Sequence, residues 1–303
     1  KTMFERIFKL SEHKTTVKTE VMAGITTFMT MAYILAVNPS VLGSTGMDTT
    51  AVLLATALAS CLGTLCMAFM ANLPFALSAG MGLNAFMAYT VVAGYGYSWQ
   101  VALLAVFIEG LIFIVLSLTN VREAIFNAIP LTLKKGVSVG IGLFIAFIGL
   151  QNSGLCVDSA TLVGIISFPE NFHTAGICAL LTLIGLFFTA VFYTRKMKGA
   201  ILYGILLTWI LGMLCQVTGL YVPTPDAGFY SLFPSWGMTD FSKLGLTFGQ
   251  CFNVDFSAVG IVNFIVVIFS FLFVDIFDTL GTLIGVATKA KMLDKDGTLP
   301  GIK

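Results

Sequence analysis

Long apolar runs, separated by short polar segments, dominate the pattern of this chain. Eight runs of roughly 17 to 25 residues can be read, at positions 21–37, 51–70, 73–92, 99–118, 131–150, 175–193, 199–218 and 261–287. Each is long enough to cross the hydrocarbon core of a bilayer as a helix. The pattern therefore predicts an all-α polytopic membrane protein with about eight transmembrane helices in this chain.

The basic residues fall in every second segment between these runs. With a cytoplasmic N-terminus, the inner segments hold Lys1, Arg6, Lys9, Lys14, Lys18, Arg122, Lys134, Lys135, Arg195, Lys196, Lys198, Lys289, Lys291, Lys295 and Lys303, and only Lys243 lies outside. Because cytoplasmic loops collect Lys and Arg, this alternation predicts a multi-pass protein of the cell membrane with its N-terminus inside.

Composition agrees with a membrane protein and excludes other classes. Hydrophobic residues make up 57% of the chain, charged residues 10%, and the net charge is +1. The expected partner is the lipid bilayer, and no basic face suggests nucleic acid. Six cysteines without CxxC spacing give no sign of a metal or another cofactor. No nucleophile elbow or nucleotide loop indicates an enzyme.

The third run contains residues that weaken a continuous helix. Pro74, Gly80 and Gly82 precede Asn84, and a good helical sequence follows. We therefore expect residues 75–82 to be extended or unwound and residues 85–92 to form a regular helix. A broken helix leaves backbone N–H groups free near the middle of the bilayer, where many secondary transporters hold their substrates. The alternative is close helix packing through small residues.

The last run contains two acids where a charge is costly. Asp275 and Asp278 are three residues apart, and Thr282 is four residues beyond Asp278, so all three share one helix face. Two carboxylates this close should hold at least one proton in a low-dielectric cavity. The alternative is a packing pair bonded to hydroxyls or Arg, but no Lys or Arg lies in the middle of any run. A ligand or proton site is the favoured interpretation.

Glu109, in the fourth run, is a third acid within a predicted span. It either couples protons or bonds to a polar stripe on the first span, formed by Thr26, Thr30 and Tyr33. Both interpretations stay open at this point. In the fifth run, helix packing is the expected role of Gly136, Gly140 and Gly142.

Four stretches carry a resemblance to a known family. They are GITTFMTMAYILAVNPSVL (24–42), ALSAGMGLNAFMAY (76–89), FIEG (107–110) and VDIFDTLGTLIGVA (274–287). Together they resemble the signature segments of bacterial and fungal purine permeases, the AzgA-like branch of the nucleobase–cation symporter family. The similarity runs from Phe4 to Lys303.

The resemblance implies a fold of two inverted repeats of seven helices, divided into a core domain and a gate domain. After a cytoplasmic N-terminal segment (1–20), the first repeat would span 21–218. An extracellular connector (219–260), with a short amphipathic piece at 241–252, would lead to the start of the second repeat at 261–303. We expect the rest of that repeat to lie outside this chain. It would include a tenth helix that carries a glutamate and meets the third helix at the substrate site.

The resemblance carries over Asn84, Asp275 and Asp278 as residues for binding or coupling. A purine base is flat, with donors and acceptors on its edges, and suits amide and carboxylate partners with an aromatic such as Phe86 or Tyr33 on its face. The predicted substrate-binding residues are Asn84, Asp278, Phe86, Gly82 and Thr282, and the predicted proton-coupling residues are Asp275 and Glu109.

The implied function is import of adenine, guanine or hypoxanthine by proton symport, with an elevator-like or rocking core moving against the gate. No cofactor beyond the coupling proton is expected, and a homodimer is compatible with this interpretation. Two alternatives remain: an anion transporter of the related sulfate/bicarbonate fold, which would be expected to avoid paired acids, and a cation channel lined by them. Saturable, proton-dependent uptake with competition by unlabelled bases would separate the carrier from both.

The alternation of basic segments yields a topological prediction. A cysteine introduced beside Lys196 or Lys289 should resist an impermeant thiol reagent in intact cells and react after permeabilisation, because both segments are cytoplasmic. Efficient labelling of either cysteine from outside would contradict this orientation.

Overall fold

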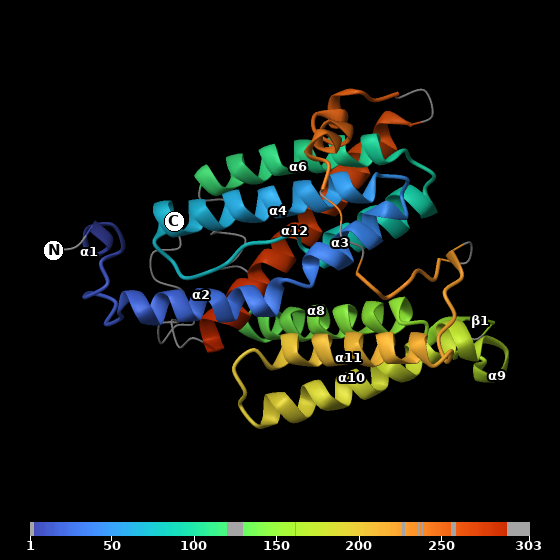
Figure 1. Cartoon of the computed structure of the whole chain (residues 1–303). Helices are drawn as coiled ribbons and strands as arrows, with labels where there is room; N and C mark the ends of the chain where they lie inside the picture. Colours follow the sequence, from blue (N-terminus) through green and yellow to red (C-terminus); the bar gives the residue numbers. More distant parts are fainter. Residues whose placement is uncertain are drawn as a thin grey trace. The chain divides into compact units, whose positions relative to one another are not determined.

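The computed structural model describes residues 3–119, 130–160, 162–225, 228–234, 237, 239–255 and 259–289 (Figure 1). In chain order the elements are α1 (Met3–Phe8), α2 (Val17–Met31), α3 (Ile34–Gly43), α4 (Thr49–Cys66), η1 (Met67–Ala71), α5 (Met81–Ala85), η2 (Phe86–Gly94), α6 (Trp99–Leu118), α8 (Leu131–Asn152), β1 (Cys156–Ser159), β2 (Leu162–Ile165), α9 (Phe168–Asn171), η3 (Phe172–Gly176), α10 (Ile177–Thr194), α11 (Ala200–Val217), η5 (Phe241–Leu246), η6 (Gln250–Phe252) and α12 (Ile261–Lys289). Of the basic residues used for the topology, Lys1, Arg122, Lys291, Lys295 and Lys303 lie outside this described part.

The structure is mostly helical, as predicted. Among the described residues, six helices are long and apolar enough to cross a membrane. Two further apolar helices, Met81–Gly94 and Val139–Asn152, are shorter, so the count of eight equal spans is not confirmed. The all-α prediction is also wrong in detail, because β1 and β2 form an antiparallel hairpin that pairs Cys156 with Ile165.

The first predicted span is two helices in sequence. Thr16 caps α2 by accepting a hydrogen bond from the Thr19 N–H, which places the start of the helix four residues before the predicted one. The helix ends at Met31, and α3 begins at Ile34 and contains Pro39. Apolar periodicity continues across this break, so hydropathy alone reads the two helices as one.

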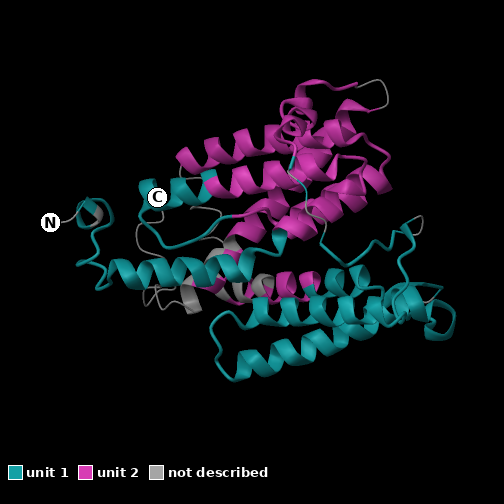
Figure 2. Cartoon of the chain, in the orientation of Figure 1, with its two compact units in different colours: residues 1–34, 62–77, 146–239 teal, residues 35–61, 78–145, 240–303 magenta. Residues whose placement is uncertain are grey.

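The chain forms two compact units whose segments alternate along the sequence (Figure 2). Unit 1 comprises residues 1–34, 62–77 and 146–239, and unit 2 comprises residues 35–61, 78–145 and 240–303. These boundaries differ from the predicted repeat boundaries. A compact unit consists of helices that contact one another, whereas a repeat consists of helices that follow one another along the chain. The division into repeats stays a prediction.

In unit 1, α10 and α11 pack closely through two matched glycine–threonine contacts. A Cβ on Gly185 would collide with the Thr208 hydroxyl, and a Cβ on Gly204 would collide with the Thr189 hydroxyl. Each threonine donates to the carbonyl of the glycine four residues earlier in its own helix, Thr189 to Gly185 at 2.7 Å and Thr208 to Gly204 at 2.8 Å. The glycines thus let the two backbones approach, as small residues do between membrane helices.

The first half of the predicted connector is fastened to the end of α11. The Tyr221 hydroxyl donates to the Tyr230 carbonyl at 2.7 Å, and the Trp209 indole donates to the Leu232 carbonyl at 2.8 Å. Gln216 accepts from the Leu232 N–H at 2.8 Å and donates to Ser231 at 2.9 Å. These bonds satisfy backbone groups in a segment without regular structure.

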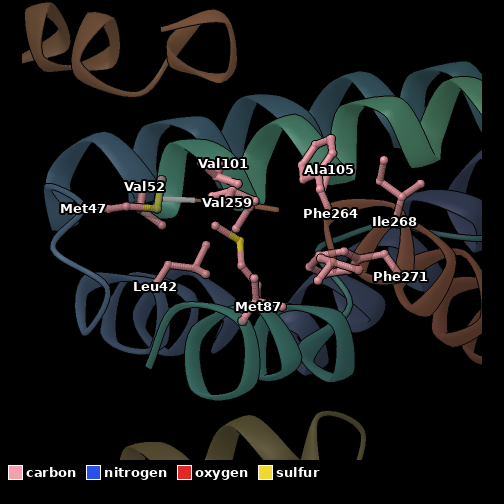
Figure 3. Close-up of a cluster of buried hydrophobic side chains, with 13 residues drawn as sticks. Leu42, Met47, Val52, Met87, Val101, Ala105, Val259, Phe264, Ile268 and Phe271 are labelled. Carbon is pink, nitrogen blue, oxygen red and sulfur yellow. The ribbon is translucent and has the colours of Figure 1, made fainter. Parts of the chain in front are cut away.

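Unit 2 is built around α12, which packs along α6. A continuous apolar cluster joins these helices to α3, α4 and η2, and Figure 3 shows side chains from all five converging. Phe271 of α12 is fully buried in this cluster and meets Phe86 edge to face, with ring centroids 5.1 Å apart. The cluster fixes α12, and therefore the acids it carries, against α6 and the helix that follows the break.

The second half of the connector belongs to unit 2. Asp240 caps η5 by accepting from the Ser242 N–H at 3.0 Å, and Phe252 meets Phe107 of α6 with ring centroids 5.3 Å apart. Lys243 pairs with Asp48 at 3.2 Å. The Ala51 N–H and the Lys243 ammonium hold the pKa of Asp48 below its usual range. The expected short structured piece at 241–252 is present as two 3₁₀ helices, η5 and η6.

The prediction of helix packing at three glycines of α8 is wrong for the described residues. A Cβ added at Gly136, Gly140 or Gly142 would meet no atom within 4 Å. Glycine spacing shows where a helix could approach another, and the neighbouring helix decides whether it does.

The α10–α11 contact can be tested by adding one methyl group. Gly185→Ala or Gly204→Ala should destabilise the protein by about 1 to 3 kcal/mol, because the methyl group would overlap a threonine in a close-packed contact. Thermal unfolding in detergent is the measurement, and Gly140→Ala is the matched control. Adding Thr208→Ala to Gly185→Ala should restore stability. If Gly185→Ala and Gly140→Ala are equally stable, the contact does not hold the two helices together.

Candidate functional site

The third predicted span is broken, and the break lies close to its predicted place. Helical structure ends at Asn72, whose φ of 52° is left-handed, and resumes at Met81. Residues 72–80 have no regular structure, so the predicted departure at 75–82 is confirmed with its end moved two residues earlier. The expectation of a regular helix over 85–92 is wrong, because η2 from Phe86 is a wider π-helix.

The extended segment is bound to polar side chains of α4. Within unit 1, Thr64 accepts from the Leu77 N–H at 3.0 Å and donates to the Leu77 carbonyl at 3.2 Å. Within unit 2, the Ser60 and Ser78 hydroxyls lie 2.9 Å apart. Because an unpaired backbone group is costly in a bilayer, these contacts explain how an extended stretch persists inside a predicted span.

The Asp278 carboxylate lies against the end of the extended segment. A Cβ on Gly80 would sit 2.9 Å from Asp278 Oδ2, so only glycine leaves room for the carboxylate here. Asp278 is half-buried, and its charge interacts with that of Asp275 one turn earlier in α12. Of the predicted helix-face pair, the Asp278 side chain therefore lies against the broken helix.

Asp275 lies between Asp278 and a buried acid of α6. Glu109 is 5% exposed, and its carboxyl group interacts electrostatically with that of Asp275. Among the described residues, Glu109 Oε1 has no hydrogen-bond partner. Asp275 also accepts a hydrogen bond from the Thr279 hydroxyl at 3.3 Å. This one contact agrees with the alternative in which the aspartates are a packing pair bonded to hydroxyls.

The polar stripe of the first span is used within its own helix. Thr26 donates to the Met22 carbonyl at 2.8 Å, and Thr30 donates to the Thr27 carbonyl at 2.7 Å. Their hydroxyl hydrogens are thus not available to Glu109. Of the two interpretations of Glu109, bonding to these two threonines is thus not supported, and proton coupling stays a prediction.

Asn84 lies in α5, the first turn after the break, and its amide is held by two residues that the sequence interpretation missed. Asn84 Nδ2 donates to Asn38 Oδ1 of α3, and Asn38 Nδ2 donates to Thr56 Oγ1 of α4 at 2.7 Å. Asn38 and Thr56 are both buried. The available signal was a polar residue directly after the first apolar run and another within the second.

The remaining predicted site residues have no contact with the Asp278 carboxylate among the contacts described. Phe86 packs on Phe271 at the edge of the core cluster, and Gly82 has the Phe144 ring 3.7 Å from where its Cβ would be. Thr282 is exposed, one turn beyond Asp278. The structure thus places the Asp278 carboxylate at Gly80, one helix turn before Asn84. Charge links Asp278 to Asp275, and Asp275 to Glu109.

This arrangement suits a neutral ligand and a proton. Carboxylate and amide groups at Asp278 and Asn84 can bind N–H donors, and backbone groups at the break are close by. Burial of Glu109 beside the Asp275 carboxyl group favours a proton on one of the two acids, because two poorly solvated like charges repel each other. The site can therefore combine ligand recognition with proton binding.

Comparisons with known proteins all identify permeases as the relatives of this chain. A profile described as the permease family matches residues 18–301. The chain is 45% identical over 300 residues to a permease of Methanocaldococcus jannaschii, covering 99% of this chain and 64% of that protein. It is 40% identical over 305 residues to the adenine permease AdeP of Escherichia coli, and the match covers 99% of this chain and 63% of that protein.

A third relative is named for other purines. The guanine/hypoxanthine permease PbuG of Bacillus subtilis is 43% identical over 303 residues, covering 97% of this chain and 64% of that protein. The chain thus spans 63 to 64% of the length of these three relatives.

Proposed function

Since this chain belongs to the permease family, we propose that it acts in a secondary transporter that imports purine nucleobases. Relatives named adenine permease and guanine/hypoxanthine permease support the substrate class. The observation that carries the proposal is the Asp278 carboxylate seated against Gly80, beside the helix turn that carries Asn84. A broken helix facing an acid within the membrane is typical of a transport site.

Purine recognition follows from the chemistry of these groups. The N–H groups of a purine can donate to the Asp278 carboxylate and to the Asn84 amide oxygen. Free backbone N–H groups at the start of the Met81–Gly94 helix can donate to the ring nitrogens of the purine. The paired acids would repel an inorganic anion, which argues against the sulfate/bicarbonate alternative.

Proton symport is the second part of the proposal. We assign the coupling proton to the Asp275–Glu109 pair, because the two carboxyl groups interact and Glu109 is almost completely buried. Removing that proton would leave two facing charges in a poorly solvated place, which is costly. The pair should therefore gain and lose its proton together with a change in exposure.

The division into two units supports an elevator-like or rocking motion. Asn84, Asp275, Asp278 and Glu109 all belong to unit 2. We assign unit 2 to the moving core and unit 1 to the gate, so that substrate and proton travel with one body. Saturable uptake driven by an imposed proton gradient would support the carrier, whereas ion currents without saturation would support a channel.

A glycine substitution tests whether the seat of Asp278 is the substrate site. Gly80→Ala should weaken purine binding by about 1 kcal/mol or more, because the new methyl group displaces the carboxylate from its place. Binding is measured by calorimetry on the full-length protein, with Gly149→Ala, where a Cβ meets open space, as the control. Unchanged affinity in Gly80→Ala would remove Asp278 from the site.

The two aspartates of α12 should divide binding from coupling. Asp278→Asn keeps the shape and removes the charged acceptor, so purine affinity should fall by about 1.5 to 3 kcal/mol, the scale of a charge-assisted hydrogen bond. Asp275→Asn should spare binding and abolish accumulation against a gradient, because a neutral amide resembles the protonated acid and cannot release a proton.

Both variants are compared by calorimetry and by proton-driven uptake in vesicles. If both bind and accumulate purine like the parent, the aspartates are structural and the site assignment fails. If the two phenotypes are exchanged, the pair is functional and the roles are reversed.

A further inference from the structure

Three polar side chains of unit 2 form a hydrogen-bonded chain whose direction is fixed at one end. The Thr56 hydroxyl donates its single hydrogen to the Val52 carbonyl at 2.7 Å, so toward Asn38 it can only accept. Asn38 therefore turns its amide nitrogen to Thr56, at 2.7 Å, and its amide oxygen to Asn84. Asn84 must therefore donate to that oxygen from its own amide nitrogen.

The consequence lies at the far end of the chain. With its nitrogen bound to Asn38, Asn84 has its amide oxygen directed elsewhere, and among the described residues that oxygen receives no hydrogen bond. We propose that Asn38 and Thr56 are positioning residues that hold Asn84 as a hydrogen-bond acceptor for an N–H group of the purine. This inference rests on the proposed function and assigns a direction to one of its contacts.

Burial makes the orientation hard to reverse. Asn38 is 3% exposed and Thr56 5% exposed, so water cannot replace a lost partner at either residue. Turning the Asn84 amide over would bring its oxygen against the oxygen of Asn38. Turning Asn38 as well would bring its oxygen against Thr56, whose hydrogen would then have to leave the Val52 carbonyl. Each step costs a buried hydrogen bond.

The orientation has a consequence for the substrate class. Asn84 and Asp278 both present acceptors, so they select for purines with free N–H groups on the bound edge. A site built to bond an N–H group strongly rejects an analogue that lacks it, because the buried acceptor is left unpaired. A methyl group on the contacted nitrogen should therefore be rejected, and the rejection should depend on Thr56.

Thr56→Val removes the fixed end of the chain without changing its shape. In the full-length protein, the KM for the best purine should rise about tenfold, the scale of one hydrogen bond, with kcat little changed. Discrimination between that purine and its ring N-methyl derivatives should fall in parallel. Thr56→Ser keeps the hydroxyl and should restore both values. Thr182→Val removes a similar bond to a helix carbonyl, Cys178, at 2.9 Å, and should behave like the parent.

Each result supports or overturns the inference. If the parent transports purines and Thr56→Val keeps the parental KM and discrimination, the positioning role is wrong while the proposed function stands. If the parent transports no purine, the proposed function fails and the inference falls with it. If Thr56→Val does not reach the membrane, Asn38→Asp replaces it. That carboxyl still accepts from Asn84, so loss of discrimination in a folded Asn38→Asp protein overturns the inference.

Discussion

Every backbone N–H and C=O inside a bilayer must find a partner within the protein, and the arrangement of the site depends on this constraint. The segment 72–80 has no helix to satisfy its own groups. The Thr64 hydroxyl serves both backbone groups of Leu77, and the Ser60–Ser78 contact lies one residue further on. These side chains of α4 therefore help to hold the segment extended up to Gly80, where the Asp278 carboxylate lies and after which the helix that carries Asn84 begins.

The sequence predicts what depends on local chemistry. Apolar runs predicted a polytopic helical protein, and Pro74 with Gly80 predicted the break, because proline and glycine weaken a helix wherever they occur. The paired acids pointed to a site because a charge in an apolar run is costly in any fold. The boundaries were less predictable. The left-handed turn at Asn72 has a local signal that the prediction did not use, because asparagine is common in this conformation and Pro74 follows it. The wide turns of η2 have no such marker in the local sequence.

What the sequence could not predict depends on which helices become neighbours. Asn38, Thr56 and Asn84 are polar residues in three different helices, and only folding joins them. The roles of the glycines likewise depend on which helices are neighbours. Gly185 and Gly204 face threonines of a neighbouring helix, whereas Gly140 faces open space, although all three lie in apolar helices. The β1–β2 hairpin was missed because its strands have only four residues each.

In the proposed mechanism, the position of Asp275 between Asp278 and Glu109 links ligand and proton. An N–H group bound to Asp278 stabilises the charge of that carboxylate, and a charged Asp278 repels a second charge on Asp275. Ligand binding therefore favours a proton on the Asp275–Glu109 pair. Since coupling between two sites is reciprocal, a proton on that pair equally favours the ligand. Two substrates that strengthen each other's binding tend to be carried together, which is the thermodynamic requirement for symport. One aspartate whose charge interacts with both neighbours is enough to meet it.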